Sequence, residues 1–311
     1  MIGHFLLAAP DALFEWRDVG VEYIGFLAAF ATLGAVGFRY GVLAIAAREP
    51  LGGNSAGPAY DTVIRSATTT AAVIGLIGAV LGIAKFLGDV AGDAAEHSQT
   101  IAQFIAEHVG RSGVPLALLA VAALAFGAAS RRVPGGWPVA AVAAVAFAVR
   151  NLASGKAQSM VNPLHILAAS LWLGTLAVLM IAALPAALRP QVPSESRGPI
   201  VARLVGAFSP LALGSAALLA VTGVLTAWRH LKFLSALWTT PYGVALDCKL
   251  VVVACVVALG WWNWQRVRPI CGTEPGARQM QTSAARELMV TGVVLAITAV
   301  LVSLPTPKLP H

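Results

Sequence analysis

A histidine near the start of one long apolar segment is the first residue suited to binding a ligand. His165 precedes Trp172 by seven positions, so the two side chains share one face of a helix. Ionisable residues inside a membrane are costly and point to function, although a histidine at the interface costs little. Met160 is a soft sulfur donor close to that imidazole in sequence. The pair suits Cu(I), and the ordinary alternative for Met160 is contact with lipid or core.

Three consecutive polar residues stand inside another apolar segment. Asp247, Cys248 and Lys249 cannot all face one way on a helix, so at least one of them points into the protein or toward an ion-pair partner. Asp247 and Lys249 either neutralise each other or extend toward water. Cys248 is either a soft copper donor or a small packing residue.

A polar stripe follows one predicted helix and ends near His230. Ser215, Thr222, Thr226 and Arg229 are spaced by seven, four and three residues. Such a stripe lines a polar path, or its hydroxyls bond across helices or to their own backbone. His230, at the end of the stripe, is a further candidate metal ligand.

Enzyme motifs of soluble proteins are absent. The sequence contains no nucleotide-binding loop, no His-Glu-x-x-His pair, no serine hydrolase elbow and no Cys-x-x-Cys. We therefore expect a protein that is not an enzyme. Arg39 and Glu287 are expected near the opposite face of the membrane as members of a structural ion pair.

The elements that position these residues are membrane helices. The composition is 58% hydrophobic and only 11% charged, which no soluble core accommodates. The net charge of +7 is typical of cytoplasmic loops of a membrane protein and does not indicate nucleic-acid binding. The motifs Gly37-x-x-x-Gly41 and Gly78-x-x-x-Gly82 predict close helix packing. The sequence thus predicts an all-α, polytopic helix bundle in the lipid bilayer.

About eight segments reach the roughly 20 apolar residues that a spanning helix needs. The predicted spans are Val21–Ala47, Thr62–Leu87, Val114–Ser130, Trp137–Leu152, Pro163–Leu188, Pro210–Arg229, Pro241–Trp264 and Glu287–Leu304. The fourth is the shortest. Helix starts are predicted where a capping residue precedes proline, at Asn162-Pro163, Ser209-Pro210 and Thr240-Pro241.

Charge asymmetry predicts the orientation. The connection that carries Arg266, Arg268, Arg278 and Arg286 is the clearest basic loop, and an excess of Lys and Arg marks the cytoplasmic side. Both termini are then external. All six histidines also fall on or near that external side: His4, His97, His108, His165, His230 and His311.

The carboxy-terminal half carries a series of motifs. They are Phe208-Ser209-Pro210-Leu211-Ala212-Leu213, Thr222-Gly223, Leu237-Trp238-Thr239-Thr240-Pro241-Tyr242-Gly243, Lys249 and Asn263-Trp264-Gln265-Arg266. This order, with the preceding His165 to Gly174 segment and with Glu287 and Pro305, resembles the CopD family of copper-resistance membrane proteins over about residues 162 to 306.

The resemblance implies an eight-helix bacterial inner-membrane protein that moves or handles copper, together with a periplasmic partner of the CopC type. It implies family roles for His165, Trp172, Thr240, Tyr242, Gly243, Lys249, Asn263 and Glu287. We divide the chain into an amino-terminal membrane region, 1–160, and a CopD-like domain, 161–311, each with about four helices.

Two positions depart from the family pattern. Lys156 stands where many relatives carry histidine, and a cationic lysine is a poor copper ligand; Asp247-Cys248 replaces residues that are usually apolar. Three functions are therefore considered. The first is copper transport that accepts copper at the periplasmic face, with His165, Met160, His230 and Cys248 as ligands. The others are a non-transporting subunit of a larger membrane complex, and a bis-histidine haem cytochrome.

Overall fold

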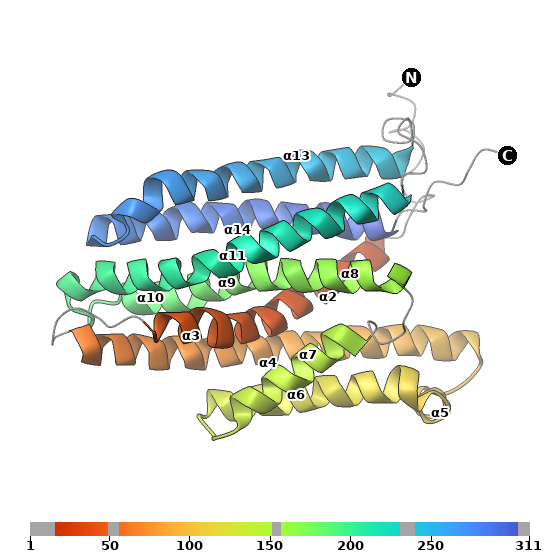
Figure 1. Cartoon of the computed structure of the whole chain (residues 1–311). Helices are drawn as coiled ribbons and strands as arrows, with labels where there is room; N and C mark the ends of the chain where they lie inside the picture. The colour runs from red at the N-terminus through yellow and green to blue at the C-terminus, as the bar shows by residue number, and fades with distance from the viewer. Residues whose placement is uncertain (1–15, 49–55, 151–156, 231–239, 304–311) are drawn as a thin grey trace.

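The computed structural model describes residues 16–48, 56–150, 157–230 and 240–303, and within these ranges every regular element is a helix (Figure 1). The elements are α2 Trp16–Val36, η2 Gly37–Val42, α3 Leu43–Ala46, α4 Ala56–Glu96, α5 Ile101–Glu107, η3 Val109–Gly113, α6 Val114–Ser130, α7 Gly136–Val149, α8 Ala157–Ala169, η5 Ser170–Gly174, α9 Thr175–Val178, η6 Leu179–Ala183, α10 Leu184–Ala187, α11 Ser194–His230, α13 Pro241–Trp262, η7 Asn263–Val267, η8 Arg268–Ile270 and α14 Glu274–Ser303. The segments η2, η3, η5, η6 and η7 are π-helical turns within longer helices.

Seven helices of the described chain are long and apolar enough to cross a membrane. An eighth apolar helix, α7, has only 14 residues. It covers about 21 Å, which is less than the roughly 30 Å of a bilayer's hydrocarbon core. The predicted all-α membrane bundle is confirmed, and the predicted fourth span is a shorter helix than the others.

Two of the three predicted helix starts are wrong. Pro163 lies inside α8 and Pro210 lies inside α11, because both helices begin earlier in the chain. Proline is tolerated inside membrane helices, so a capping residue before proline does not mark a start there. The third start is confirmed, since the Thr240 hydroxyl accepts a hydrogen bond from the Gly243 amide at 3.0 Å.

The last helix also begins earlier than predicted. It starts at Glu274, and Glu287 lies near its middle. The first half of α14 is polar on average, yet it buries Gly276, Ala277, Met280 and Ala284 along one face. An average over all residues misses such an amphipathic stretch, because its charged face cancels its apolar face.

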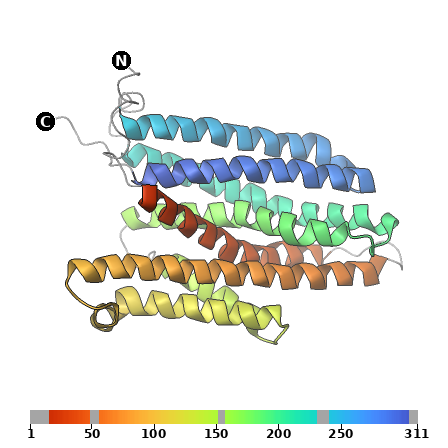
Figure 2. The same ribbon diagram turned by 180° about the vertical axis from the view of Figure 1, so that it is seen from behind.

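The helix from α8 to α10 lies at the centre of the bundle and is its most buried span (Figures 1 and 2). It contacts α2, α4, α11 and α14, and one hydrophobic core joins these helices with α6 and α7. A helix of the amino-terminal half, α2, therefore packs directly on the carboxy-terminal half. The division of the chain at residue 160 stays a prediction.

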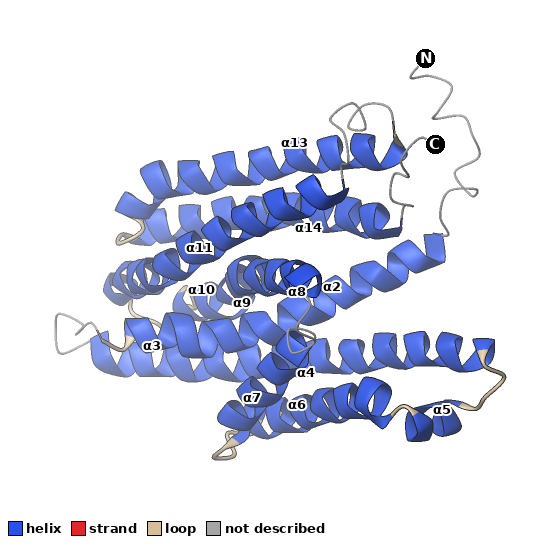
Figure 3. Cartoon of the chain, turned by 45° about the vertical axis from the view of Figure 1, so that its right-hand side comes forward, coloured by secondary structure: helices blue, strands red, loops and turns tan. Residues whose placement is uncertain are grey.

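Small residues allow the closest contacts. The helix formed by α2 and η2 crosses the central helix obliquely (Figure 3), and the backbones of Gly34 and Gly174 meet where they cross. A Cβ added at Gly37 would collide with the Thr175 hydroxyl, and one at Gly78 would lie 2.6 Å from the Thr32 hydroxyl. The glycine motifs therefore act in helix packing, as predicted.

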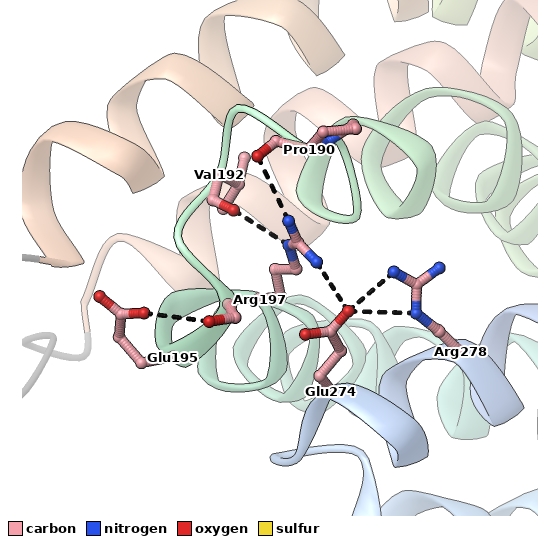
Figure 4. A network of polar contacts seen from close by, with 7 residues as sticks. Pro190, Val192, Glu195, Arg197, Glu274 and Arg278 are labelled. Atoms are coloured by element: carbon pink, nitrogen blue, oxygen red, sulfur yellow. Dashed lines mark hydrogen bonds and ion pairs between the residues drawn. The ribbon is translucent and has the colours of Figure 1, made fainter.

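The two ends of the bundle differ. At the end where α2 begins and α14 finishes, called here the terminal end, α8 also begins. At the opposite end, called here the Arg197 end, α11 and α14 begin. Figure 4 shows the Arg197 guanidinium there, 2.6 Å from a Glu274 oxygen that also binds Arg278 at 2.7 Å. The Arg197–Glu274 pair joins the starts of the two helices, and Arg197 also donates to the carbonyl oxygen of Val192, just before α11, at 3.0 Å.

Candidate functional site

The terminal half of the bundle contains a histidine held by a second helix. The Nδ1 atom of His165, on α8, lies 3.0 Å from the Oγ1 atom of Thr222, on α11. The Thr222 hydroxyl also lies 2.7 Å from the carbonyl oxygen of Leu218 in its own helix. A hydroxyl has one proton, and the shorter contact takes it. The imidazole then donates its Nδ1 proton to Thr222, which leaves Nε2 with a lone pair for a ligand.

Lys249 is the charged group that faces this histidine. Its ammonium group on α13 interacts electrostatically with the His165 imidazole. Among the described residues no carboxylate pairs with Lys249, so the alternative in which Asp247 and Lys249 neutralise each other is not realised there. A cation held at His165 experiences repulsion from Lys249, which weakens its binding.

Of the other ligands predicted at this end, Cys248 is the one whose side chain the structure describes. Cys248 is exposed on the surface of α13. Met160 lies within α8, five residues before His165, and this spacing places the two positions about 140° apart around the helix. His230 is the last residue of α11. The side chains of Met160, His230 and Tyr242 lie outside the described part of the structure.

The stripe on α11 bonds mainly to its own backbone. Thr226 donates to the carbonyl oxygen of Thr222 at 2.8 Å, and Thr222 also contacts His165 on α8. Ser215 and Thr222 are buried. Within the described part of the stripe, Thr222 therefore links α11 to α8 through His165.

A second group of polar residues lies deeper, between η7 and α14. Asn263 donates its side-chain amide to a Glu287 oxygen at 3.0 Å and accepts a hydrogen bond from the Ser283 hydroxyl. Asn263 and Glu287 are both buried. Arg39 and Glu287 were expected to take part in ion pairs, but among the described residues neither forms one, and the Glu287 carboxylate bonds Asn263. The Arg39 Nε atom is buried there without a hydrogen-bond partner.

These deeper residues line a cavity of about 430 Å³. Its walls come from the central helix, α11, the helix of α13 and η7, and α14, and they are mostly apolar. Trp172, Asn263 and Glu287 all line it. The sequence placed these three residues on three separate helices, and the fold brings them to one cavity. Both Trp172 and Asn263 lie in π-helical turns, which are frequent at functional sites.

Several residues of the cavity were missed from the sequence. Met180 and Met280 are buried in its wall, and Arg268 lines it from the Arg197 end. Methionines in apolar segments look like core residues, so their type alone gives no signal. The spacing of seven between Met280 and Glu287 would have placed both on one helix face, had the last helix been extended to Glu274. Among the described residues, no group of three or more His, Cys, Asp or Glu side chains is arranged to hold a metal ion.

Comparison with known proteins gives one family. Residues 202–301 match the family model of copper resistance protein D, CopD. No curated protein and no solved structure matches the chain. The match includes Thr222, Lys249, Asn263 and Glu287, whereas His165 and Trp172 precede it. With its helical bundle, the chain is a multi-pass membrane protein whose residues 202–301 are similar to the CopD family of copper-resistance proteins.

Proposed function

We propose that this protein carries copper through the bacterial inner membrane and accepts it at the periplasmic face through His165. The observation that supports this most is the orientation of the imidazole. Thr222, inside the CopD region, holds Nδ1 and leaves Nε2 available in the terminal half of the bundle. Repulsion from Lys249 keeps the affinity moderate, which suits an ion that must be released again.

The orientation of the chain follows from the same proposal. The start of α2, the end of α14 and His165 lie on the periplasmic side, and the basic Arg197 end lies in the cytoplasm. The two termini themselves, predicted to be external, lie outside the described residues. A periplasmic copper-binding protein of the CopC type delivers the ion to the terminal end. Met160 and His230 are then the candidates for completing the outer site, and exposed Cys248 is a weaker one.

The proposal is tested on the intact chain. Detergent-purified protein is titrated with Cu(I) in competition with a chelator, and cells that produce the protein are compared with vector controls for total copper. We expect bound copper and a raised cellular copper content. A folded protein that binds no Cu(I) and leaves cellular copper unchanged would contradict the proposal.

A second function is favoured by one observation. The described residues assemble no cluster of three metal-binding side chains, as expected for a CopD-like subunit that supports a larger membrane complex without transport. Purification of the protein in fixed stoichiometry with other membrane subunits, free of metal, would support this function instead. A haem role needs two facing histidines, and the described residues place only His165 within a candidate span.

Thr222→Val tests how the imidazole is held. Valine has nearly the shape of threonine but accepts no hydrogen bond, so His165 loses the partner that fixes its tautomer. Supporting hydrogen bonds of this kind are worth about 10–100-fold in metal affinity, and we expect a loss of that size in the Cu(I) titration.

Thr298→Val is the control for this substitution. Thr298, on α14, uses its hydroxyl to bond the Val294 carbonyl of its own helix at 2.7 Å. Its replacement should leave copper affinity unchanged. Equal affinities of the Thr222→Val variant and the wild type would show that the contact does not position a ligand.

A further inference from the structure

Two sulfur donors line the deeper cavity. Met180 on η6 and Met280 on α14 are 6% and 5% exposed, and both line the cavity. The two elements contact each other, so the methionines approach from neighbouring helices. Methionine also fills gaps in ordinary cores. Here, however, the two side chains border open space that also contains a carboxylate.

The chemistry of this set fits one kind of ion. Thioethers are soft ligands that select Cu(I), and mostly apolar walls disfavour ions that keep a hydration shell. Asn263 occupies one oxygen of Glu287, and the other has no hydrogen-bond partner among the described residues. The carboxylate therefore supplies negative charge for a cation that has left water.

The positions also form a sequence along the bundle. Trp172 lines the cavity and lies seven residues, or about 10 Å, beyond His165 on the central helix. On α14, Met280 lies seven residues before Glu287 and therefore closer to the Arg197 end. Arg268 lines the cavity at that end and stacks on Trp264, with its guanidinium carbon 4.2 Å from the ring centroid.

We propose that this cavity is a second, inner copper site, in which Met180 and Met280 bind Cu(I) and Glu287, oriented by Asn263, balances its charge. The inference rests on the proposed copper-carrying function. Trp172 then separates the inner site from the outer one at His165, and copper moves from the imidazole to the thioethers without a change of oxidation state.

The test must separate methionine from cysteine sulfur. Cys271 is buried near the Arg197 end, and burial raises the pKa of its thiol, which disfavours the copper-binding thiolate. Selenomethionine-labelled full-length protein, loaded with Cu(I), is therefore measured by X-ray absorption at the copper edge. A copper–selenium contact arises from methionine alone.

The variants are chosen to conserve volume. Met180→Leu with Met280→Leu removes both thioethers while keeping the cavity wall, and Met160→Leu removes the methionine near the outer site. Met289→Leu is the matched control, because Met289 is on the same helix as Met280 but is 66% exposed. Thermal unfolding and gel filtration of each variant establish that the bundle is intact.

We expect a copper–selenium signal in the wild type and in the Met289→Leu, Met160→Leu and His165→Ala variants. The signal should fall in the double variant, together with one of two bound copper ions, and should disappear when Met160→Leu is added to it. An unchanged signal in the double variant overturns the inner site. Copper binding that depends on His165 but gives no selenium contact in the wild type also overturns it, and leaves the proposed function standing. A folded wild type without copper overturns both.

Discussion

Replacement of His165 by alanine is expected to remove the outer copper ion and to return cellular copper to the level of vector controls. His165 is the one histidine within a candidate span among the described residues, and its Nε2 atom is the donor that Thr222 leaves free. Cu(I) affinity should fall further in His165→Ala, which loses the ligand itself, than in Thr222→Val, which loses only the hydrogen-bond partner of that ligand and for which a fall of roughly 10–100-fold is expected. Competition titration with Cu(I) and whole-cell copper analysis measure the two effects.

His97→Ala is the matched control. His97 lies outside the candidate spans, and its Nδ1 atom is 2.7 Å from the Asp93 carbonyl oxygen of the preceding helix. This substitution removes an imidazole without touching the outer site, so affinity and cellular copper should stay at wild-type values. If His165→Ala retains both values as well, copper does not enter through this residue.

The sequence predicted the membrane bundle because hydrocarbon requires long apolar helices, and composition reveals that requirement directly. The sequence did not predict where α11 and α14 begin. Both α11 and α14 continue into polar stretches where one face is still buried, as at Ile200 and Ala277. Their burial depends on neighbouring helices, and an average over the sequence contains no information about neighbours.

Several residues of the candidate site were predicted from the sequence, but the contacts between them were not. His165 and Thr222 were both singled out, but their contact depends on how far α8 is shifted along α11, which no local pattern records. Glu287 was expected to be a member of a structural ion pair near one membrane face. Asn263 satisfies the carboxylate instead, from the adjacent helix of the same hairpin.

The largest structural effect is expected at the crossing of α2 with the central helix. In Gly34→Ala the new Cβ would collide with the backbone carbonyl group of Gly174, which cannot rotate away as a side chain would. Overpacking commonly costs about 1–3 kcal/mol, and a backbone clash should lie at or above the upper limit. Because the central helix carries both His165 and Trp172, the separation of these two helices should also displace the copper sites. Thermal unfolding in detergent and Cu(I) titration of the folded fraction report the two consequences.

Gly20→Ala tests whether the loss of stability in Gly34→Ala comes from the helix crossing or from replacing any glycine of α2. Gly20 lies in the same helix, α2, and no atom of the described residues would lie within 4 Å of an added Cβ. Alanine favours a helix over glycine by about 0.5–1 kcal/mol, so this variant should be as stable as the wild type or slightly more stable. Opposite signs for the two substitutions are therefore expected, since the same methyl group favours the helix at Gly20 and separates two helices at Gly34. Stability equal to that of the wild type in Gly34→Ala would mean that the two backbones are not in contact in the membrane.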